Sequence, residues 1–232
     1  MRRHIPLTLG LALAITLAGC GSVQNVPIRD RDSPAGSVRA TFHGKTGARP
    51  SGPGIEVGYE HYTAKDAQTL ALGESVVLDN ASFVGPQTLQ HKAQMQYGYV
   101  AYNHRLRFGE HFELEPFVGV ARVHFKLRTT PGSGSTVTSL SDRRTGAIGG
   151  VTPRWRFNDW LAVEGRLSYL NASAWASGAT YEAAVVFSPA PQVALRFGYS
   201  DRRHEIEPVL SGAVSEVTVR ARGPMATLQF DF

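Results

Sequence analysis

Residues 161–169 read Leu-Ala-Val-Glu-Gly-Arg-Leu-Ser-Tyr, with the large apolar side chains at odd positions and the charged ones at even positions. Successive side chains of a β-strand point to opposite faces of its sheet, so this alternation predicts a strand with one apolar and one polar face. The same period of two recurs along the chain beyond residue 54, and no helical apolar periodicity follows the first 20 residues. The sequence therefore predicts an all-β protein.

Composition narrows the class of protein further. The chain has 232 residues, of which 42% are hydrophobic and one is a cysteine. This length supports a substantial core, and a single cysteine excludes a disulfide framework or a multi-cysteine metal site. The formal net charge of +5 includes two arginines of a predicted leader, Arg2 and Arg3. No recognition motif accompanies the small remaining charge, so we expect no nucleic-acid partner.

The first residues have the layout of a secretory signal. Two arginines precede an apolar stretch from Leu7 to Gly19, which is too short to span a bilayer. The stretch ends in Leu17-Ala18-Gly19-Cys20, which resembles the lipobox of bacterial lipoproteins. The resemblance implies removal of residues 1–19, acylation of Cys20 and, because Gly21 follows, export to the outer membrane. An ordinary signal with an incidental cysteine is the alternative.

The remainder divides into a linker and a strand-rich domain. Residues 20–53 are rich in Arg, Asp, Ser, Gly and Pro, which predicts a lipidated, flexible periplasmic linker. Residues 54–232 predict eight strands, near residues 55–60, 91–108, 112–120, 147–157, 161–169, 179–187, 193–200 and 214–232. Tight turns at 109–111, 158–159 and 189–191 alternate with longer connections, including 63–90 and 128–142. We therefore expect an antiparallel up-and-down barrel with both termini at the short-turn end.

Three features favour a transmembrane barrel over a soluble one. Several apolar faces supply the five residues that a membrane band about 25 Å tall requires. Aromatic residues fall at both ends of these faces, as expected at two membrane interfaces. The opposite face is charged, so we expect it to fill the interior with ion pairs. Its members are Glu56, Glu60, Glu113, Glu115, Arg154, Arg156, Glu164, Arg166, Glu182, Arg196, Arg202, Arg220 and Arg222.

The C-terminal segment carries a family resemblance. Residues 226–232, Ala-Thr-Leu-Gln-Phe-Asp-Phe, alternate and end in phenylalanine, like the last strand of Gram-negative outer-membrane barrels. Residues 54–232 thus resemble the small eight-stranded barrels of the outer-membrane protein A and X type. The resemblance implies an outer-membrane location, short periplasmic turns, longer extracellular loops and recognition of the last strand by the barrel-assembly machinery. We expect a monomer whose N-terminus is lipid-anchored on the periplasmic side.

Strand phase is ambiguous in two places. The apolar residues change from odd to even positions within 91–108 and again near Gly223-Pro224. In the third strand, a constant phase would turn Arg122, His124, Lys126 and Arg128 outward at the height of lipopolysaccharide headgroups, whose phosphates they could neutralise. A bulge at Gly119 would instead turn them inward.

Candidate chemistry is sparse. Residues 200–205, Ser-Asp-Arg-Arg-His-Glu, contain the residue types of an acyl hydrolase but not the His-X-Ser pattern of lipid A deacylases. The histidines form no set with metal-ligand spacing, so we expect no metal and no cofactor. The leading hypothesis is a non-catalytic outer-membrane barrel lipoprotein with a structural, lipopolysaccharide-contacting or surface-interaction role. The alternatives are an outer-membrane lipid-modifying enzyme, or a periplasmic ligand-binding barrel lipoprotein.

Overall fold

The computed structural model describes residues 25–43, 51–78, 81–132, 137–173, 175–207 and 216–232. These residues form an all-β structure. Its strands are β1 Asn25–Asp30, β2 Ala35–His43, β3 Gly52–Leu70, β4 Ser75–Leu78, β5 Ala81–Val84, β6 Gln87–Phe108, β7 Phe112–Pro131, β8 Thr138–Arg156, β9 Leu161–Asn171, β10 Ala176–Ala190, β11 Val193–Ile206 and β12 Glu216–Asp231.

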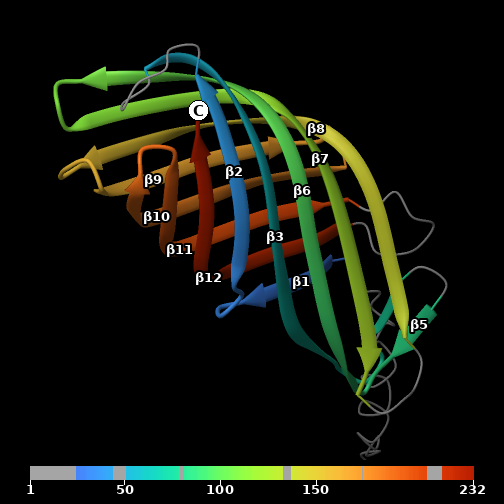
Figure 1. The fold of residues 1–232 in the computed structure, drawn as a ribbon. Coiled ribbons are helices and arrows are strands. Elements are labelled where there is room, and N and C mark those ends of the chain that lie inside the picture. The colour runs from blue at the N-terminus through green and yellow to red at the C-terminus, as the bar shows by residue number, and fades with distance from the viewer. Residues whose placement is uncertain (1–24, 44–50, 79–80, 133–136, 174, 208–215) are drawn as a thin grey trace, which may run out of the picture.

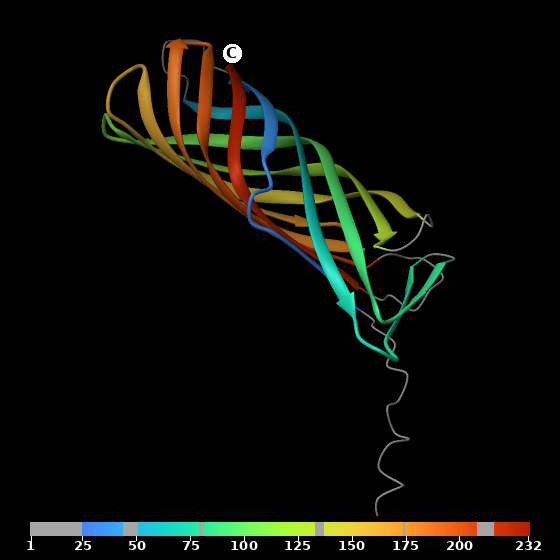
Figure 2. The same cartoon turned by 90° about the horizontal axis from the view of Figure 1, so that it is seen from below.

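Ten of these strands form one large, mostly antiparallel sheet (Figures 1 and 2). Strands β3 and β6 to β12 follow one another as an antiparallel meander. Strand β12 also pairs in parallel with β1 and then with β2, and β2 pairs antiparallel with β3. The sheet therefore closes on itself. A separate hairpin of β4 and β5 packs Val76, Leu78 and Phe83 against the core.

The predicted linker is wrong over residues 25–43, because β1 and β2 belong to the sheet. The eight predicted strands correspond to β3 and β6 to β12, so the sheet contains two more strands than expected. Strand β2 does alternate, with Val38, Ala40 and Phe42 outward and Arg39, Thr41 and His43 inward. It was not predicted because the surrounding segment is rich in Arg, Asp, Ser, Gly and Pro, which was interpreted as a linker. Of the linker that remains, residues 20–24 and 44–50, like the predicted leader and Cys20, lie outside the described residues.

The two ends of the closed sheet differ in their connections. Residues 109–111, 157–160 and 191–192 join strands at the turn end, and residues 71–86, 132–137, 172–175 and 207–215 join them at the loop end. The predicted loops 63–90 and 128–142 are largely strand, since β3 reaches Leu70 and β7 reaches Pro131. Asn25 pairs with Glu216 at the loop end, whereas Phe232 lies beside β2 at the turn end. The expectation that both termini lie at the turn end is therefore wrong for the first described residue.

Strands β6, β7 and β12 each keep one phase along their length. In β12 the odd positions face inward from Val217 to Gln229, and in β6 they face inward from Ala93 to Arg105. The register of β6 with β7 shows no shift, so the alternative of a bulge at Gly119 is wrong. A Cβ on Gly119 would lie 2.1 Å from the carbonyl oxygen of Val100, and only glycine permits this close approach of two strands.

The sheet closes where β12 pairs with β1 and then with β2, and the change of partner requires an irregular stretch of β12. Strand β12 leaves β1 after Ala221 and meets β2 at Met225, and the interval contains Gly223 and Pro224. A Cβ on Gly223 would lie 2.2 Å from the carbonyl oxygen of Ser33. Proline is tolerated where a ladder is interrupted, because its missing N–H then has no partner to lose. This explains how β12 carries a proline although the sheet has no open edge there.

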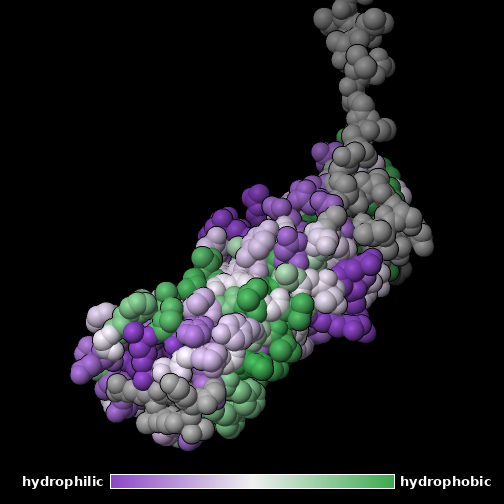
Figure 3. Space-filling model, turned by 90° about the horizontal axis from the view of Figure 1, so that it is seen from above, coloured by the Kyte–Doolittle hydropathy of each residue, from purple (hydrophilic) through white to green (hydrophobic). Residues whose placement is uncertain are grey.

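Polarity reverses along the closed sheet. We define the turn-end region as the part from the short turns up to outward Tyr59, Tyr169, Tyr181 and Tyr199, and the loop-end region as the part beyond them. In the turn-end region the outer face is apolar, as with Val57, Tyr102, Phe108, Val118, Val120, Trp155, Val163, Leu167, Val185 and Phe197. In the loop-end region the apolar residues are inside, as with Val26, Ile28, Ala64, Leu89, Met95, Val123, Phe125, Leu127, Ile206, Val217 and Val219. Figure 3 shows the hydrophobic residues as a band between two more hydrophilic ends.

Candidate functional site

Ion pairs occupy the interior of the turn-end region. All six predicted carboxylates face inward and are buried. At the centre, Glu164 accepts a hydrogen bond from Arg154 Nε at 2.8 Å and lies 2.6 Å from a guanidinium nitrogen of Arg196. Charged groups removed from water are tolerated when they are paired and hydrogen-bonded in this way.

Tyrosines extend this network on two sides. Glu56 accepts hydrogen bonds from Arg166 at 2.8 Å and from the Tyr99 hydroxyl at 2.6 Å. Nearer the loop end, Arg202 Nε donates to Glu60 at 2.7 Å, and the Tyr97 hydroxyl donates to its other oxygen at 2.6 Å. The network therefore ends in aromatic hydroxyls where the interior becomes apolar.

The prediction of an interior position is wrong for two arginines, and two arginines that were not predicted lie inside instead. Arg220 and Arg222 point outward and contact Asp201 at 3.4 and 2.8 Å. Inside, Arg39 lies 3.5 Å from Glu56 and 3.8 Å from Glu164. Arg105 lies 2.7 Å from Glu115 and 3.4 Å from Asp231. The five remaining predicted arginines, Arg154, Arg156, Arg166, Arg196 and Arg202, contact interior carboxylates.

The four predicted headgroup-contacting residues face outward on β7. Val123, Phe125 and Leu127 alternate with them and are buried in the core. Because strand pairing aligns neighbours, Lys92 of β6 lies opposite Arg128 and Arg143 of β8 lies opposite His124. We call Lys92, His124, Lys126, Arg128 and Arg143 the cation face. Sequence reasoning missed Lys92 and Arg143, which only the register brings to this face.

The cation face contains a small pocket of about 290 Å³, lined in part by Lys92, Lys126, Arg128, Ser139 and Ser141. Like charges placed directly opposite one another destabilise a strand pair, so an anion bound here would relieve the repulsion. His124 Nε2 shares a hydrogen bond with Ser141 Oγ at 3.0 Å. Partial burial and then the charges of Arg143 and Lys126 lower the pKa of His124.

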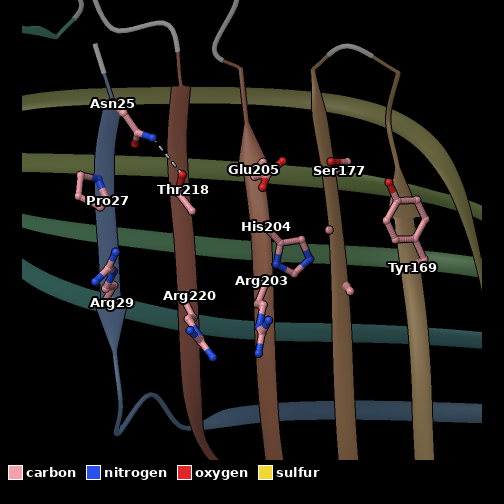
Figure 4. A pocket seen from close by; sticks show the side chains of 12 residues that line it. Asn25, Pro27, Arg29, Tyr169, Ser177, Arg203, His204, Glu205, Thr218 and Arg220 are labelled. Carbon is pink, nitrogen blue, oxygen red and sulfur yellow. Dashed lines mark hydrogen bonds between the residues drawn. The ribbon is translucent and has the colours of Figure 1, made fainter. Parts of the chain in front are cut away.

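A second outward pocket lies across β1, β12, β11, β10 and β9 and has a volume of about 580 Å³ (Figure 4). Arg29, Arg220 and Arg203 come from three adjacent strands and line it together with Glu205 and three hydroxyl groups. We call it the arginine pocket. The hydroxyl groups belong to Tyr169, Ser177 and Thr218. Beside it, the Arg203 guanidinium lies 5.9 Å from the ring centre of Tyr181.

The segment with hydrolase-like residues does not assemble a catalytic set. Strand alternation sends Ser200 and His204 inward, whereas Asp201 and Glu205 lie on the outer face. His204 Nδ1 shares a hydrogen bond with the Tyr62 hydroxyl at 2.9 Å, and Ser200 Oγ donates to a backbone carbonyl. Burial lowers the pKa of His204 to about 3. The histidine is therefore a neutral member of the core in this structure.

Comparisons with known proteins give no match: no family model, no curated protein and no solved structure resembles the chain significantly. In the part of the chain that the structure describes, no helix has the length and apolar character needed to cross a membrane. The same residues contain no group of three or more His, Cys, Asp or Glu side chains placed to hold a metal ion.

Proposed function

We propose that the protein is a non-catalytic outer-membrane barrel lipoprotein with a structural role, which spans the membrane with its turn-end region and contacts lipopolysaccharide with its cation face. The observation that carries the proposal is the reversal of polarity along the closed sheet. An apolar outer belt over a charged interior suits a bilayer, whereas a polar outer face over an apolar interior suits water.

The apolar belt is the physical argument for insertion. Val118, Val120 and Phe197 expose 62%, 59% and 57% of their surface on the outer face. Soluble monomers rarely expose contiguous apolar patches larger than a few hundred Å². Each Å² that leaves water is worth roughly 25 cal/mol, so covering the belt with acyl chains is strongly favourable.

The cation face fits the same placement. On the outer face of β7, Val120 is the last apolar residue and Arg122 the first cation. This change supports a membrane position in which His124, Lys126 and Arg128 lie just outside the bilayer, at the depth of lipid phosphates. Guanidinium and ammonium groups form strong charge-assisted hydrogen bonds with phosphate oxygens.

The structure changes the proposed position of the lipid anchor. Four residues separate Cys20 from Asn25, a stretch that can cover at most about 18 Å. Asn25 lies at the loop end. We therefore infer that an acylated Cys20 would anchor the chain on the side of the membrane where the loops lie, rather than at the turn end as the sequence suggested.

Tryptophan quenching by brominated lipids tests insertion, because the three tryptophans divide between the two regions. Trp155 and Trp160 are half-exposed on the outer face at the turn end, and Trp175 is 4% exposed in the loop-end core. In vesicles, the Trp175→Phe variant should be strongly quenched. The double variant Trp155→Phe/Trp160→Phe should be quenched little. Equal quenching of the two proteins would contradict the proposed membrane position.

Electrophoresis before and after boiling gives a second, independent reading. A closed transmembrane sheet should migrate faster when it has not been heated, because it stays compact in detergent. Identical mobility before and after boiling would count against the proposal.

A further inference from the structure

The outer apolar belt contains a groove of about 660 Å³ between β7 and β11. Strand pairing forms the row of the groove that lies nearer the turn end. This row contains five successive neighbours from β7 to β11: Phe112, Trp155, Val163, Val185 and Phe197. In the row above, Gly165 pairs with Ala183, and Ala183 pairs with Tyr199. The small residues Gly165 and Ala183 form the floor, and aromatic side chains form the walls. We call this feature the acyl groove.

The groove crosses the belt obliquely. Phe112 directly follows a short turn, whereas Tyr199 belongs to the tyrosines that mark the upper limit of the belt. Four steps between neighbouring strands cover roughly 19 Å. The groove therefore provides a continuous apolar path from the turn-end rim of the belt to its loop-end rim.

The arginine pocket begins where the acyl groove ends. Tyr199 lines the groove, and Arg203, four residues farther along β11, lines the pocket. The same spacing separates Gly165 from Tyr169 on β9. A single row across three strands lies between the two features: Leu167, Tyr181 and Asp201.

The charge of the pocket selects the kind of headgroup. Three arginines line it against one carboxylate, Glu205. Asp201 lies beside it and contacts Arg203 at 3.1 Å and Arg220 at 3.4 Å. Arg222 also contacts Asp201, so cations remain in excess around this carboxylate. An anionic group above the groove would therefore meet several guanidinium donors, which suit phosphate oxygens.

We propose that the acyl groove and the arginine pocket form one binding site for a phosphorylated membrane lipid, with an acyl chain in the groove and the phosphate on Arg203, Arg220 and Arg29. This inference rests on the proposed membrane position of the turn-end region. It adds a lipid site whose groove crosses β7 to β11 near the turn end and whose arginines lie on β1, β11 and β12. None of the residues of the cation face lines this site.

Native mass spectrometry of the full chain in mild detergent tests the site, with phosphatidylglycerol and phosphatidylcholine as probes. The wild-type protein should retain phosphatidylglycerol about tenfold more tightly, the difference expected for charge-assisted contacts with a net anionic lipid. The double variant Arg203→Gln/Arg220→Gln should reduce this preference several-fold, to the level that the separate cation face retains. The control Arg144→Gln, which removes a 47% exposed cation on β8 outside both proposed lipid sites, should leave the preference unchanged.

The groove is tested by filling it. Ala183→Phe should weaken retention of both lipids several-fold, whereas Val118→Phe, which enlarges an outward residue of the belt on β7 away from the groove, should not. If Ala183→Phe fails to fold, Gly165→Leu is the second variant, because a Cβ at Gly165 meets only ordinary contacts of 3.5 Å or more.

Each contrary outcome has a clear meaning. Equal retention of the two lipids by the wild-type protein, or undiminished retention by the groove variant, would overturn the proposal. A dimer that disappears in Ala183→Phe would show that a second copy of the chain occupies the groove, which also overturns it. The variants should keep heat-dependent mobility and the lipid quenching of Trp155 and Trp160, so failure of this site is distinguishable from failure of membrane insertion.

Discussion

The turn-end and loop-end regions of the sheet use the same strands with opposite chemistry. In the turn-end region Glu164 and Arg196 are buried inside while Val163 and Phe197 face outward, and in the loop-end region Phe125 and Val217 are inside while Lys126 and Thr218 face outward. The backbone does not change phase between the regions. The difference teaches that face polarity is independent of strand phase in a closed sheet: one uninterrupted alternation carries an apolar outer face in one region and an apolar interior in the other.

The largest expected effect on stability comes from removing a carboxylate from the ion-pair network inside the turn-end region. Glu164→Ala removes the shared partner of Arg154 and Arg196. It leaves these buried guanidinium groups with only their longer contacts, Arg154 to Glu113 at 3.9 Å and Arg196 to Glu182 at 3.3 Å. We expect a loss of about 4 kcal/mol in the free energy of unfolding, as for other broken buried ion pairs. The urea concentration at which the fast-migrating band disappears measures this loss.

The surface pair Asp142–Arg144 provides the control for that prediction. Asp142→Asn removes a pair in which the Arg144 side chain is 47% exposed. It should change stability by less than about 1 kcal/mol. Similar effects of the two variants would mean that the interior network contributes no more than a surface ion pair.

The next largest effect comes from a cavity in the loop-end core. Phe125 is 1% exposed, and Phe125→Ala should cost about 3 kcal/mol through lost burial and an unfilled cavity. Urea denaturation of protein in detergent measures it. The adjacent outward variant Lys126→Ala should be nearly neutral, and a neutral Phe125→Ala would show that the loop-end interior is not a packed core.

A smaller effect should appear on acidification. Burial lowers the pKa of His204 to about 3 in the folded state, against about 6.5 when unfolded. The unfolded chain therefore binds the proton first, and stability falls as pH drops below 6.5, by about 2 kcal/mol at pH 5. Unfolding measured at pH 7 and 5 should show this difference for the wild-type protein, and His204→Gln should remove this part of it. An unchanged pH dependence in the variant would contradict the assignment.

The smallest effect on stability belongs to the cation face. Lys126→Glu/Arg128→Glu breaks up a set of like charges, so the free energy of unfolding should change by less than about 1 kcal/mol. Co-purification of lipopolysaccharide should nevertheless fall sharply, because the phosphates lose their partners. Arg144→Glu, a charge reversal on β8 outside the cation face, serves as the control. Unchanged lipopolysaccharide binding in the double variant would exclude the cation face as the contact.

Sequence periodicity was sufficient to locate the strands of the meander and to identify the inward carboxylates. The prediction failed where the apolar residues change from the outer face to the inner face of the sheet. The shift of apolar residues from Val217 and Val219 to Leu228 and Phe230 suggested a change of strand phase, but the side chains alternate without interruption. The polarity of the two faces reverses instead, and this explains why Arg220 and Arg222 were predicted to lie inside.

The remaining errors have a related cause. Residues 63–70 and 128–131 appeared to be loops because the outer face of the loop-end region is polar, although both segments are strand. Strand β2 has the same alternation as the predicted strands but lies in a segment whose polar and Gly/Pro-rich composition indicated a linker, and Arg39 was missed with it. Lys92 and Arg143 required the register of three strands, which no local pattern contains.

The first two strands, β1 and β2, close the sheet through parallel pairing with β12. Strands β1 and β2 occupy successive stretches of one position beside β12, so the described strands fill nine positions around the ring, an odd number. Because β2 is parallel to β12 and antiparallel to β3, those two neighbours run in opposite directions. Without residues 25–43, β12 and β3 would have the antiparallel orientation needed to pair directly and close a narrower ring of eight strands. The N-terminal segment thus supplies the ninth position of the ring and widens the closed sheet by one strand.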